Sequence, residues 1–182
     1  PRSYLELAEV HQNRGDTPAV IQALERALDV NPHWTYAIRQ LGQALQMSSD
    51  FEKSREVFER ALAEDPLDGA NYGFLAEIQW RMDAKEIAFE TMSKGVTVQP
   101  SYRWGWEKLG EYASDLEKRD EALAIAQTLT ETRPQEQASW DILADMLGRF
   151  GRYDEQLEAI DRGLELHPRT ADFHDAKAFT LA

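Results

Sequence analysis

Five prolines recur at an interval of 34 residues along this chain of 182 residues, and no other feature constrains the fold as strongly. They are Pro32, Pro66, Pro100, Pro134 and Pro168. A fixed period of this length marks an array of similar units, each of which buries its apolar face only by stacking on its neighbours. The sequence therefore predicts a repeat architecture.

Other positions fall into the same register when the repeats are aligned from residue 1. Position 7 is leucine in all five repeats, and position 8 is always alanine or glycine, as in Leu41 and Gly42. Positions 4, 7, 8 and 11 share one helical stripe, and positions 20, 24 and 27 share a second. Each repeat is therefore predicted to form two helices, which approach closely because position 8 is small.

Turn residues separate the two predicted helices of each repeat. Turns are expected at residues 15–16, 48–50, 82–83, 118–120 and 151–152. Asp16, Asp50, Asp120 and Asp154 are predicted to cap helices, and Pro18 suits a first helical turn. The periodic prolines are expected to end each second helix, because proline lacks an amide donor and disfavours helix in the residue before it.

The aligned residues resemble the tetratricopeptide repeat, a 34-residue unit with Trp, Leu-Gly and Tyr in its first helix and Ala, Phe and Pro in its second. The resemblance implies an all-α, right-handed superhelical solenoid of antiparallel helix pairs. Five units span residues 1–34, 35–68, 69–102, 103–136 and 137–170, and residues 171–182 form a terminal helix, either a polar cap or a cut sixth repeat. We expect residues 1–182 to be one solenoid domain and a segment of a larger protein.

Repeat four departs from the pattern in its second helix. Ala126 stands where a large residue is usual, and Leu129 stands where a small one is usual. A volume-conserving exchange of this kind is tolerated better than either change alone, so we interpret it as local repacking. At position 4, Trp106 and Trp140 are predicted core residues.

Charge and composition exclude several classes of function. The chain carries 20 basic and 33 acidic residues, and its net charge of −13 argues against a nucleic-acid partner. The absence of cysteine excludes disulfides and thiolate metal sites. The sequence contains no apolar run of membrane-spanning length and no visible signal peptide, so we expect no membrane insertion and a cytoplasmic location.

The sequence carries little that suggests catalysis. None of its four histidines pairs with another at the i, i+4 spacing of helical metal sites, and His11 occupies a core position. Nucleophile elbows, phosphate-binding glycine loops and dinucleotide motifs are absent. We therefore predict a non-catalytic protein without a cofactor or a bound metal.

The resemblance also implies a concave groove lined by positions 2, 5, 6, 9, 12 and 13 of each first helix. In some family members chaperone tails are clamped by a basic residue at position 5 and asparagine at position 9 of one repeat, with asparagine at position 6 of the next. Neither possible register supplies this set, because repeat one has Leu5 and Glu9, and repeat two has Arg39 and Gln43 followed by Phe74. From the groove positions we predict nine peptide contacts, each of them aromatic or charged: Tyr36, Arg39, Phe74, Trp80, Trp104, Glu107, Glu111, Asp141 and Asp145. For Trp104, a cation–π pair with Lys108 is an alternative to ligand contact.

The four carboxylates of this set form two like-charged pairs. Glu107 and Glu111 are four residues apart on one predicted helix, as are Asp141 and Asp145 on the next first helix. Such pairs destabilise a helix by about 0.2–0.5 kcal/mol each, so their presence favours a functional acidic patch. The alternative is that an acidic protein places carboxylates on every surface. With a functional patch, we expect a peptide or protein partner that carries basic and apolar residues.

Three functions remain open at this point. The first is a non-catalytic protein-interaction module that holds a peptide in its groove. The second is a structural or regulatory arm of a larger enzyme or signalling protein, which makes intramolecular contacts or self-associates through its ends. The third is an enzyme that uses the carboxylates of repeats four and five. The first fits the repeat pattern best, because repeat arrays present extended binding surfaces.

Overall fold

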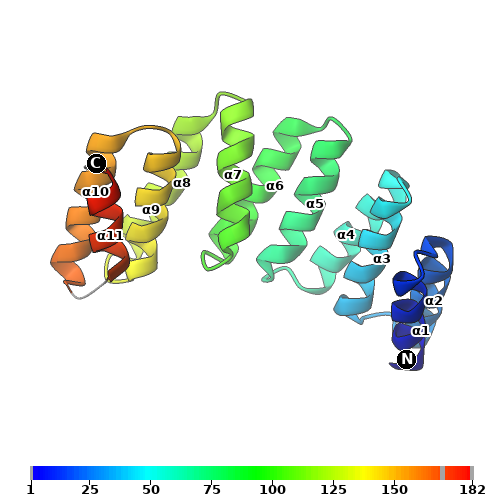
Figure 1. Cartoon of the computed structure of the whole chain (residues 1–182). Helices are drawn as coiled ribbons and strands as arrows, with labels where there is room; N and C mark the ends of the chain where they lie inside the picture. Colours follow the sequence, from blue (N-terminus) through cyan, green and yellow to red (C-terminus); the bar gives the residue numbers. More distant parts are fainter. Residues whose placement is uncertain (1, 169–170, 181–182) are drawn as a thin grey trace. The chain divides into compact units, whose positions relative to one another are not determined.

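The computed structural model describes residues 2–168 and 171–180, which form eleven α-helices and no strand (Figure 1). The all-α solenoid class predicted from the period is confirmed. Contacts divide the chain into two compact units, residues 1–99 and 100–182, which are described separately. A single domain over residues 1–182 stays a prediction. Residues 181–182, assigned to the terminal helix from the sequence, lie outside the described residues.

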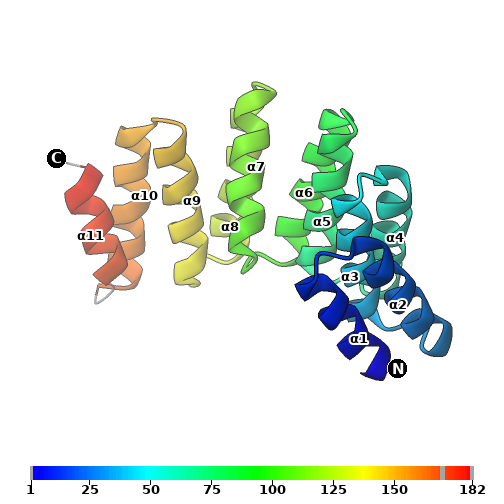
Figure 2. The same cartoon turned by 45° about the vertical axis from the view of Figure 1, so that its right-hand side comes forward.

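Each unit is built from consecutive antiparallel helices, with the partners of a pair side by side (Figures 1 and 2). The first helices from α3 onward begin at residues 35, 69, 103, 137 and 171, the first residue of each predicted repeat. The first unit contains α1 (Arg2–Asn13), α2 (Thr17–Val30), α3 (Thr35–Met47), α4 (Phe51–Glu64), α5 (Gly69–Arg81) and α6 (Lys85–Val98). The second contains α7 (Arg103–Asp115), α8 (Arg119–Thr132), α9 (Gln137–Arg149), α10 (Tyr153–Leu166) and α11 (Ala171–Thr180).

Two of the four predicted aspartate caps are confirmed. Asp16 accepts a hydrogen bond from the Ala19 amide at 3.2 Å, and Asp50 accepts one from the Lys53 amide at 3.4 Å. The prediction for Asp120 and Asp154 is wrong, because the N-caps of α8 and α10 are Lys118 and Arg152. These two aspartates stand two residues later in the repeat, inside the first helical turn. There their carboxylates face the positive end of the helix dipole.

The turn between the two helices of every repeat contains one residue in the left-handed region. These residues lie exactly one repeat apart, with φ between 59° and 73°: Gly15, Ser49, Asp83, Glu117 and Gly151. The predicted turn at residues 118–120 is therefore displaced, since the turn of repeat four is centred on Glu117 and α8 begins at Arg119. Glutamate gives little sequence signal for positive φ, which explains the error.

The periodic prolines end the second helices as predicted, and they also join consecutive repeats. Each second helix stops two residues before its proline, as α8 does at Thr132. The carbonyls of Pro66, Pro100 and Pro134 accept a hydrogen bond from the residue six positions further on, at position 4 of the next repeat, whereas the Pro32 carbonyl accepts one from Arg60. The indole Nε1 of Trp106 donates to the Pro100 carbonyl at 2.9 Å, and that of Trp140 donates to the Pro134 carbonyl at 2.8 Å.

The core of the first unit lies between its first and second helices. Leu24, Ile38 and Leu41 are buried in one cluster that continues through α2 and α3. Phe58, Leu75 and Ile78 form the next cluster, between α4 and α5. The equivalent leucine of the first repeat, Leu7, is 41% exposed, because no described helix precedes α1 to cover it.

The second unit buries the residues that the repeat register places inside. Trp106 and Leu109 of α7 are buried, and Trp140 of α9 is half-buried. Ala126 and Leu129, which exchange sizes in repeat four, are both buried in α8. Their burial on one side of the helix agrees with local repacking of the core.

Candidate functional site

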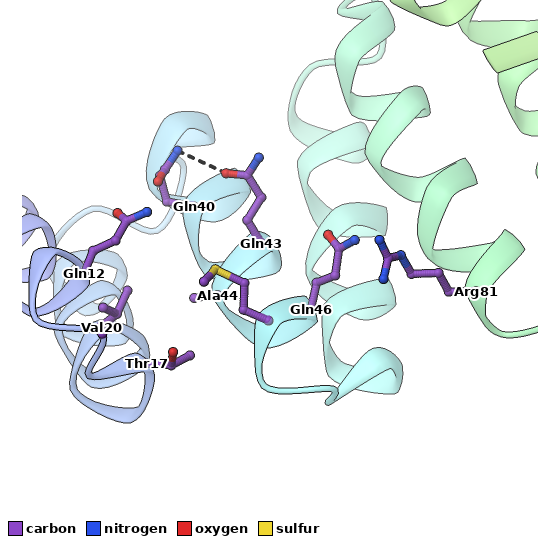
Figure 3. Close-up of a pocket in the computed structure, with 10 residues that line it drawn as sticks. Gln12, Thr17, Val20, Gln40, Gln43, Ala44, Gln46 and Arg81 are labelled. Atoms are coloured by element: carbon purple, nitrogen blue, oxygen red, sulfur yellow. Dashed lines mark hydrogen bonds between the residues drawn. The ribbon is translucent and has the colours of Figure 1, made fainter.

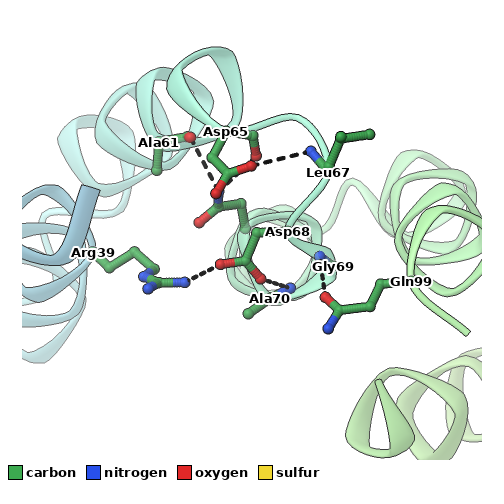
Figure 4. A network of polar contacts seen from close by, with 9 residues as sticks. Arg39, Ala61, Asp65, Leu67, Asp68, Gly69, Ala70 and Gln99 are labelled. Carbon is green, nitrogen blue, oxygen red and sulfur yellow. Dashed lines mark hydrogen bonds and ion pairs between the residues drawn. The ribbon is translucent and has the colours of Figure 1, made fainter. Parts of the chain in front are cut away.

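In the first unit, Arg39 pairs with a residue of the next repeat. Its guanidinium donates to the carboxylate of Asp68, and both side chains are half-buried (Figure 4). The same carboxylate caps α5 by accepting the Ala70 amide at 2.9 Å. Arg39 therefore holds α3 against the start of α5, and its charge is already neutralised.

The junction of α4 and α5 contains a buried polar network beside this ion pair (Figure 4). The side-chain amide of Asn71 donates to the carbonyls of Ala61 at 3.1 Å and Asp65 at 2.9 Å. The Gln99 side chain accepts the Gly69 amide at 2.8 Å. These bonds satisfy backbone groups that helix ends leave free, so the network serves the architecture.

The three aromatic residues predicted as contacts in the first unit differ in their surroundings. The half-buried ring of Phe74 stacks on the buried ring of Phe58. Trp80 is also half-buried, and the ammonium of Lys85 lies 5.4 Å from its ring centroid. Tyr36 is 51% exposed. Of the three, Tyr36 presents the most open surface to a ligand.

In the second unit, Trp104 is held in place by two neighbours. The ammonium of Lys108 lies 5.7 Å from its ring centroid, so the cation–π pair that was the alternative to ligand contact is present. The ring of Tyr102 lies 5.8 Å away in a tilted arrangement. Trp104 remains half-exposed, so one surface of a pre-positioned indole stays open to solvent.

The four predicted carboxylates of the second unit lie on α7 and α9 and are called here the acidic face: Glu107, Glu111, Asp141 and Asp145. All except the half-buried Asp141 are exposed. Glu107 and Asp145 line one narrow cleft of about 20 Å³, so the structure brings these two together.

Neighbouring groups moderate the charge of the acidic face. Arg103 and Arg149 line the same cleft as Glu107 and Asp145. Glu111 pairs with Lys108 at 2.6 Å, and Asp141 accepts a hydrogen bond from Gln137 at 3.3 Å. A cleft of this size admits no side chain, so a ligand would contact the face from outside.

A larger cleft in the first unit was not selected from the sequence. It has a volume of about 430 Å³ and is lined mainly by the first helices of three repeats (Figure 3). We call it the glutamine cleft after its polar side chains: Gln12, Gln40, Gln43 and Gln46, with Met47 and Arg81 at its α3 and α5 sides. All six stand at groove positions of the register, but the contacts predicted from the sequence were aromatic or charged residues, so the glutamines were not selected.

The altered pKa values belong to pairs outside these faces. The pKa of Asp50 is lowered because Lys53 donates to its carboxylate, and the pKa of Lys53 is raised by the same pair. The pKa of Arg152 is raised by its hydrogen bond to Glu155. All three groups lie at starts of second helices, where they reinforce the turns.

The described residues contain neither a metal-binding cluster nor a helix that could span a membrane. In those residues, no group of three or more histidine, aspartate or glutamate side chains could hold a metal ion. Within the same part of the chain, every helix is too short or too polar to cross a membrane. The described residues instead form open faces and clefts suited to contact with another molecule.

Comparison with known proteins agrees with the repeat register. The family model described as tetratricopeptide repeat matches residues 5–68 and 107–171. Protein FlbA of Caulobacter vibrioides is 24% identical over 139 residues, which cover 76% of this chain and 23% of FlbA. This chain therefore spans less than a quarter of the length of that relative.

Solved structures show the same fold at low sequence identity. The crystal structure of MamA aligns with a TM-score of 0.60 and 17% identity, covering 94% of this chain and 93% of MamA. YrrB, described as a TPR protein with an unusual peptide-binding site, aligns with a TM-score of 0.56 and 16% identity, covering 96% and 90%. With its period, its helix pairs and the match of the family model, this chain belongs to the tetratricopeptide repeat family, whose fold is a scaffold for protein–protein interaction.

Proposed function

We propose that this chain is a non-catalytic protein-interaction module and that its acidic face binds a partner segment carrying basic and apolar residues. The observation that carries the proposal is the exposure of Glu107, Glu111 and Asp145 on two consecutive first helices, close in sequence to the half-exposed Trp104. An aromatic ring offers a partner an apolar anchor, and exposed carboxylates guide a cationic segment to it.

The spacing of the carboxylates supports a role in recognition. Glu107 and Glu111 lie one turn apart on α7, and Asp141 and Asp145 lie one turn apart on α9. A face shaped only by stability would alternate charges, because like charges at this spacing oppose helix formation. A bound segment with lysine or arginine would relieve that repulsion.

The solved fold of YrrB supports peptide binding as the type of activity, since its description names a peptide-binding site. Trp104 supports an anchoring role because Lys108 and Tyr102 already hold its ring. A ring that is ordered before binding loses little conformational freedom on contact with a ligand. Tyr36 and Trp80 are proposed as further contacts within the first unit.

A structural or regulatory arm is the second candidate. The match to FlbA covers 23% of that protein, so a segment like this one occurs there within a much longer chain. In that setting the acidic face would bind another part of the same protein, or a second copy, through the same chemistry. In the first candidate the basic segment belongs to a different protein, and in the second it belongs to this protein itself or to a second copy of it.

The test uses two labelled peptides that differ only in charge. A peptide of alternating lysine and leucine should bind in fluorescence anisotropy, and a peptide with glutamate in place of lysine should not. The double variant Glu111→Lys/Asp145→Lys should lower affinity about tenfold or more, and salt should weaken binding by the wild type. The matched control Glu131→Lys/Glu158→Lys changes net charge equally on α8 and α10. Equal effects of the two double variants would rule out the acidic face.

A further inference from the structure

One face of α1 exposes apolar side chains that other first helices bury. At positions 7 and 10 of the first repeat, Leu7 is 41% exposed and Val10 is 46% exposed. The side chains at the same positions of α3, α5 and α9 are at most 7% exposed: Leu41, Ala44, Leu75, Ile78, Leu143 and Met146. Each of these three helices packs against the second helix of the preceding repeat. The surface of Leu7 and Val10, called here the α1 face, therefore lacks that kind of partner among the described helices.

The contact between α2 and α3 shows what kind of surface fits such a face. Ala23 and Leu24 of α2 lie in one buried cluster with Leu41 and Ala44 of α3. Ala27, one turn further along α2, has no exposed surface. Small residues on both sides of a large one leave grooves on a helix, and the apolar side chains of the facing helix fill them.

The same surface recurs on α10. Its residues at positions 23, 24 and 27 are Ala159, Ile160 and Gly163, and all three are buried. They repeat the order small, large, small that α2 has at Ala23, Leu24 and Ala27. The chain therefore contains both halves of a repeat contact, one on α1 and the other on α10.

In the structure α11 packs on α10 (Figures 1 and 2). Lys177, at position 7 of α11, pairs with Asp161, and Thr180, at position 10, donates to Gln156 at 3.2 Å. Position 7 is leucine in all five complete repeats. Because an exposed ion pair contributes little, these two contacts hold α11 less firmly than two buried apolar side chains would.

We propose that the α1 face of one copy packs on α10 of a second copy in place of α11, so that the protein self-associates head to tail. Leu7 and Val10 take the places of Lys177 and Thr180. Asp161 is compatible with leucine there, because position 25 is also glutamate in repeats one and two, each followed by a repeat with leucine at position 7. The two surfaces differ, so the contact is not closed by a dimer and extends to further copies.

The second copy and α11 compete for the same surface of α10. α11 belongs to the same chain as α10, which gives it a high effective concentration. Self-association therefore requires a high protein concentration. The net charge of −13 opposes it, and salt strengthens it by screening this repulsion. Binding of a cationic segment to the acidic face responds to salt in the opposite direction.

Sedimentation velocity of the full chain over a range of concentrations tests the proposal. The wild type should sediment progressively faster as its concentration rises, without a plateau at the dimer. Leu7→Glu/Val10→Glu should raise the midpoint concentration about tenfold or more, because two apolar side chains are no longer buried. The matched control Leu67→Glu/Ile87→Glu adds the same charge at side chains that are 75% and 55% exposed, and it should behave as the wild type does.

A second pair of variants tests the competition with α11. Lys177→Ala/Thr180→Ala removes both polar contacts to α10 and should lower the midpoint concentration about threefold or more. Lys94→Ala changes the net charge equally at an exposed position of α6 and should leave it unchanged.

Four results would overturn the proposal. They are a monomer at every concentration in both the wild type and Lys177→Ala/Thr180→Ala, a plateau at the dimer, equal midpoints for Leu7→Glu/Val10→Glu and its control, and no effect of loosening α11. Association that is lost only in Glu111→Lys/Asp145→Lys would also overturn it, because that result assigns the contact between copies to the acidic face.

Discussion

The ring of Phe74 stacks on the ring of Phe58, with centroids 5.3 Å apart and planes inclined by 11°. Phe58 reaches this position by passing over Gly42, where a Cβ atom would lie 2.5 Å from the ring atom Cε1. The pair links the second helix of repeat two to the first helix of repeat three. Phe74 therefore contributes to the core of the first unit as well as to its surface.

We expect Gly42→Ala to destabilise the protein by about 1–3 kcal/mol, the range for overpacking a filled core. Phe58 has no exposed surface and cannot swing aside. Urea unfolding should show the loss. The control is Gly110→Ala, where the nearest atom is Cδ of Arg149, an exposed side chain that can move. Similar losses in both variants would contradict the role given to Phe58.

Replacing Trp106 by Phe should cost about 1–2 kcal/mol of unfolding free energy, because the part-buried hydrogen bond to the Pro100 carbonyl is lost. Trp140→Phe should cost less, since water reaches the half-exposed ring and can replace the bond to Pro134. Thermal unfolding of the two variants measures the difference. A larger loss at Trp140 would be the reverse of this expectation.

The left-handed turns predict opposite effects at two equivalent positions. Glu117→Gly should stabilise the chain by about 0.5–1 kcal/mol, because glycine adopts φ of 59° without strain. Gly151→Ala should destabilise it by about 1 kcal/mol through the backbone alone, since a Cβ there meets no atom within 4 Å. Chemical unfolding checks both changes. The idea fails if the two substitutions act in the same direction.

A double-mutant cycle can separate the structural role of Arg39 from ligand binding. Arg39→Met and Asp68→Asn should show a coupling of about 1 kcal/mol, as expected for a partly buried ion pair. Asparagine keeps the cap on α5, so the cycle isolates the charge. Unfolding of all four proteins gives the coupling, and a value near zero would leave Arg39 free for a ligand.

The pKa of Asp50 predicts a stability change in acid. Its folded pKa is lowered, so the pair with Lys53 stabilises the fold above the ordinary pKa of aspartate, and this stabilisation is lost as the pH falls through the folded value. Lys53→Ala should raise the pKa toward the ordinary value in an NMR titration of the carboxyl carbon. No movement of that pKa would show that the amide of residue 53 alone holds the carboxylate.

The sequence predicted the helices well because their signals are local and repeated. Each periodic proline removes a backbone donor at the same position of its repeat, and each leucine at position 7 stands on the same helical stripe. A helix boundary that is ambiguous in one repeat can therefore be assigned from the equivalent residues of the others. The prediction that Asp120 caps a helix was wrong because this residue stands two positions after Lys118, which is the N-cap of α8. The stacking of Phe74 was missed because it depends on Phe58 and on the empty space above Gly42, a long-range relation.

The candidate sites were predicted less completely. The register placed Glu107 and Asp145 correctly on neighbouring helices, but it could not show that Arg103 and Arg149 share their cleft. The glutamine cleft was missed because all of its lining residues except Arg81 are uncharged and none is aromatic, whereas the predicted contacts were charged or aromatic.

The bonds of Asn71 have a consequence for the way the first unit comes apart. Its amide joins two carbonyls at the end of α4 to the first turns of α5, so neither helix can open without exposing a buried polar group. We therefore expect unfolding that reaches this junction to disrupt α4 and α5 together. Native-state hydrogen exchange should then report a single protection level for these two helices, a cooperative unit that crosses the boundary between repeats two and three.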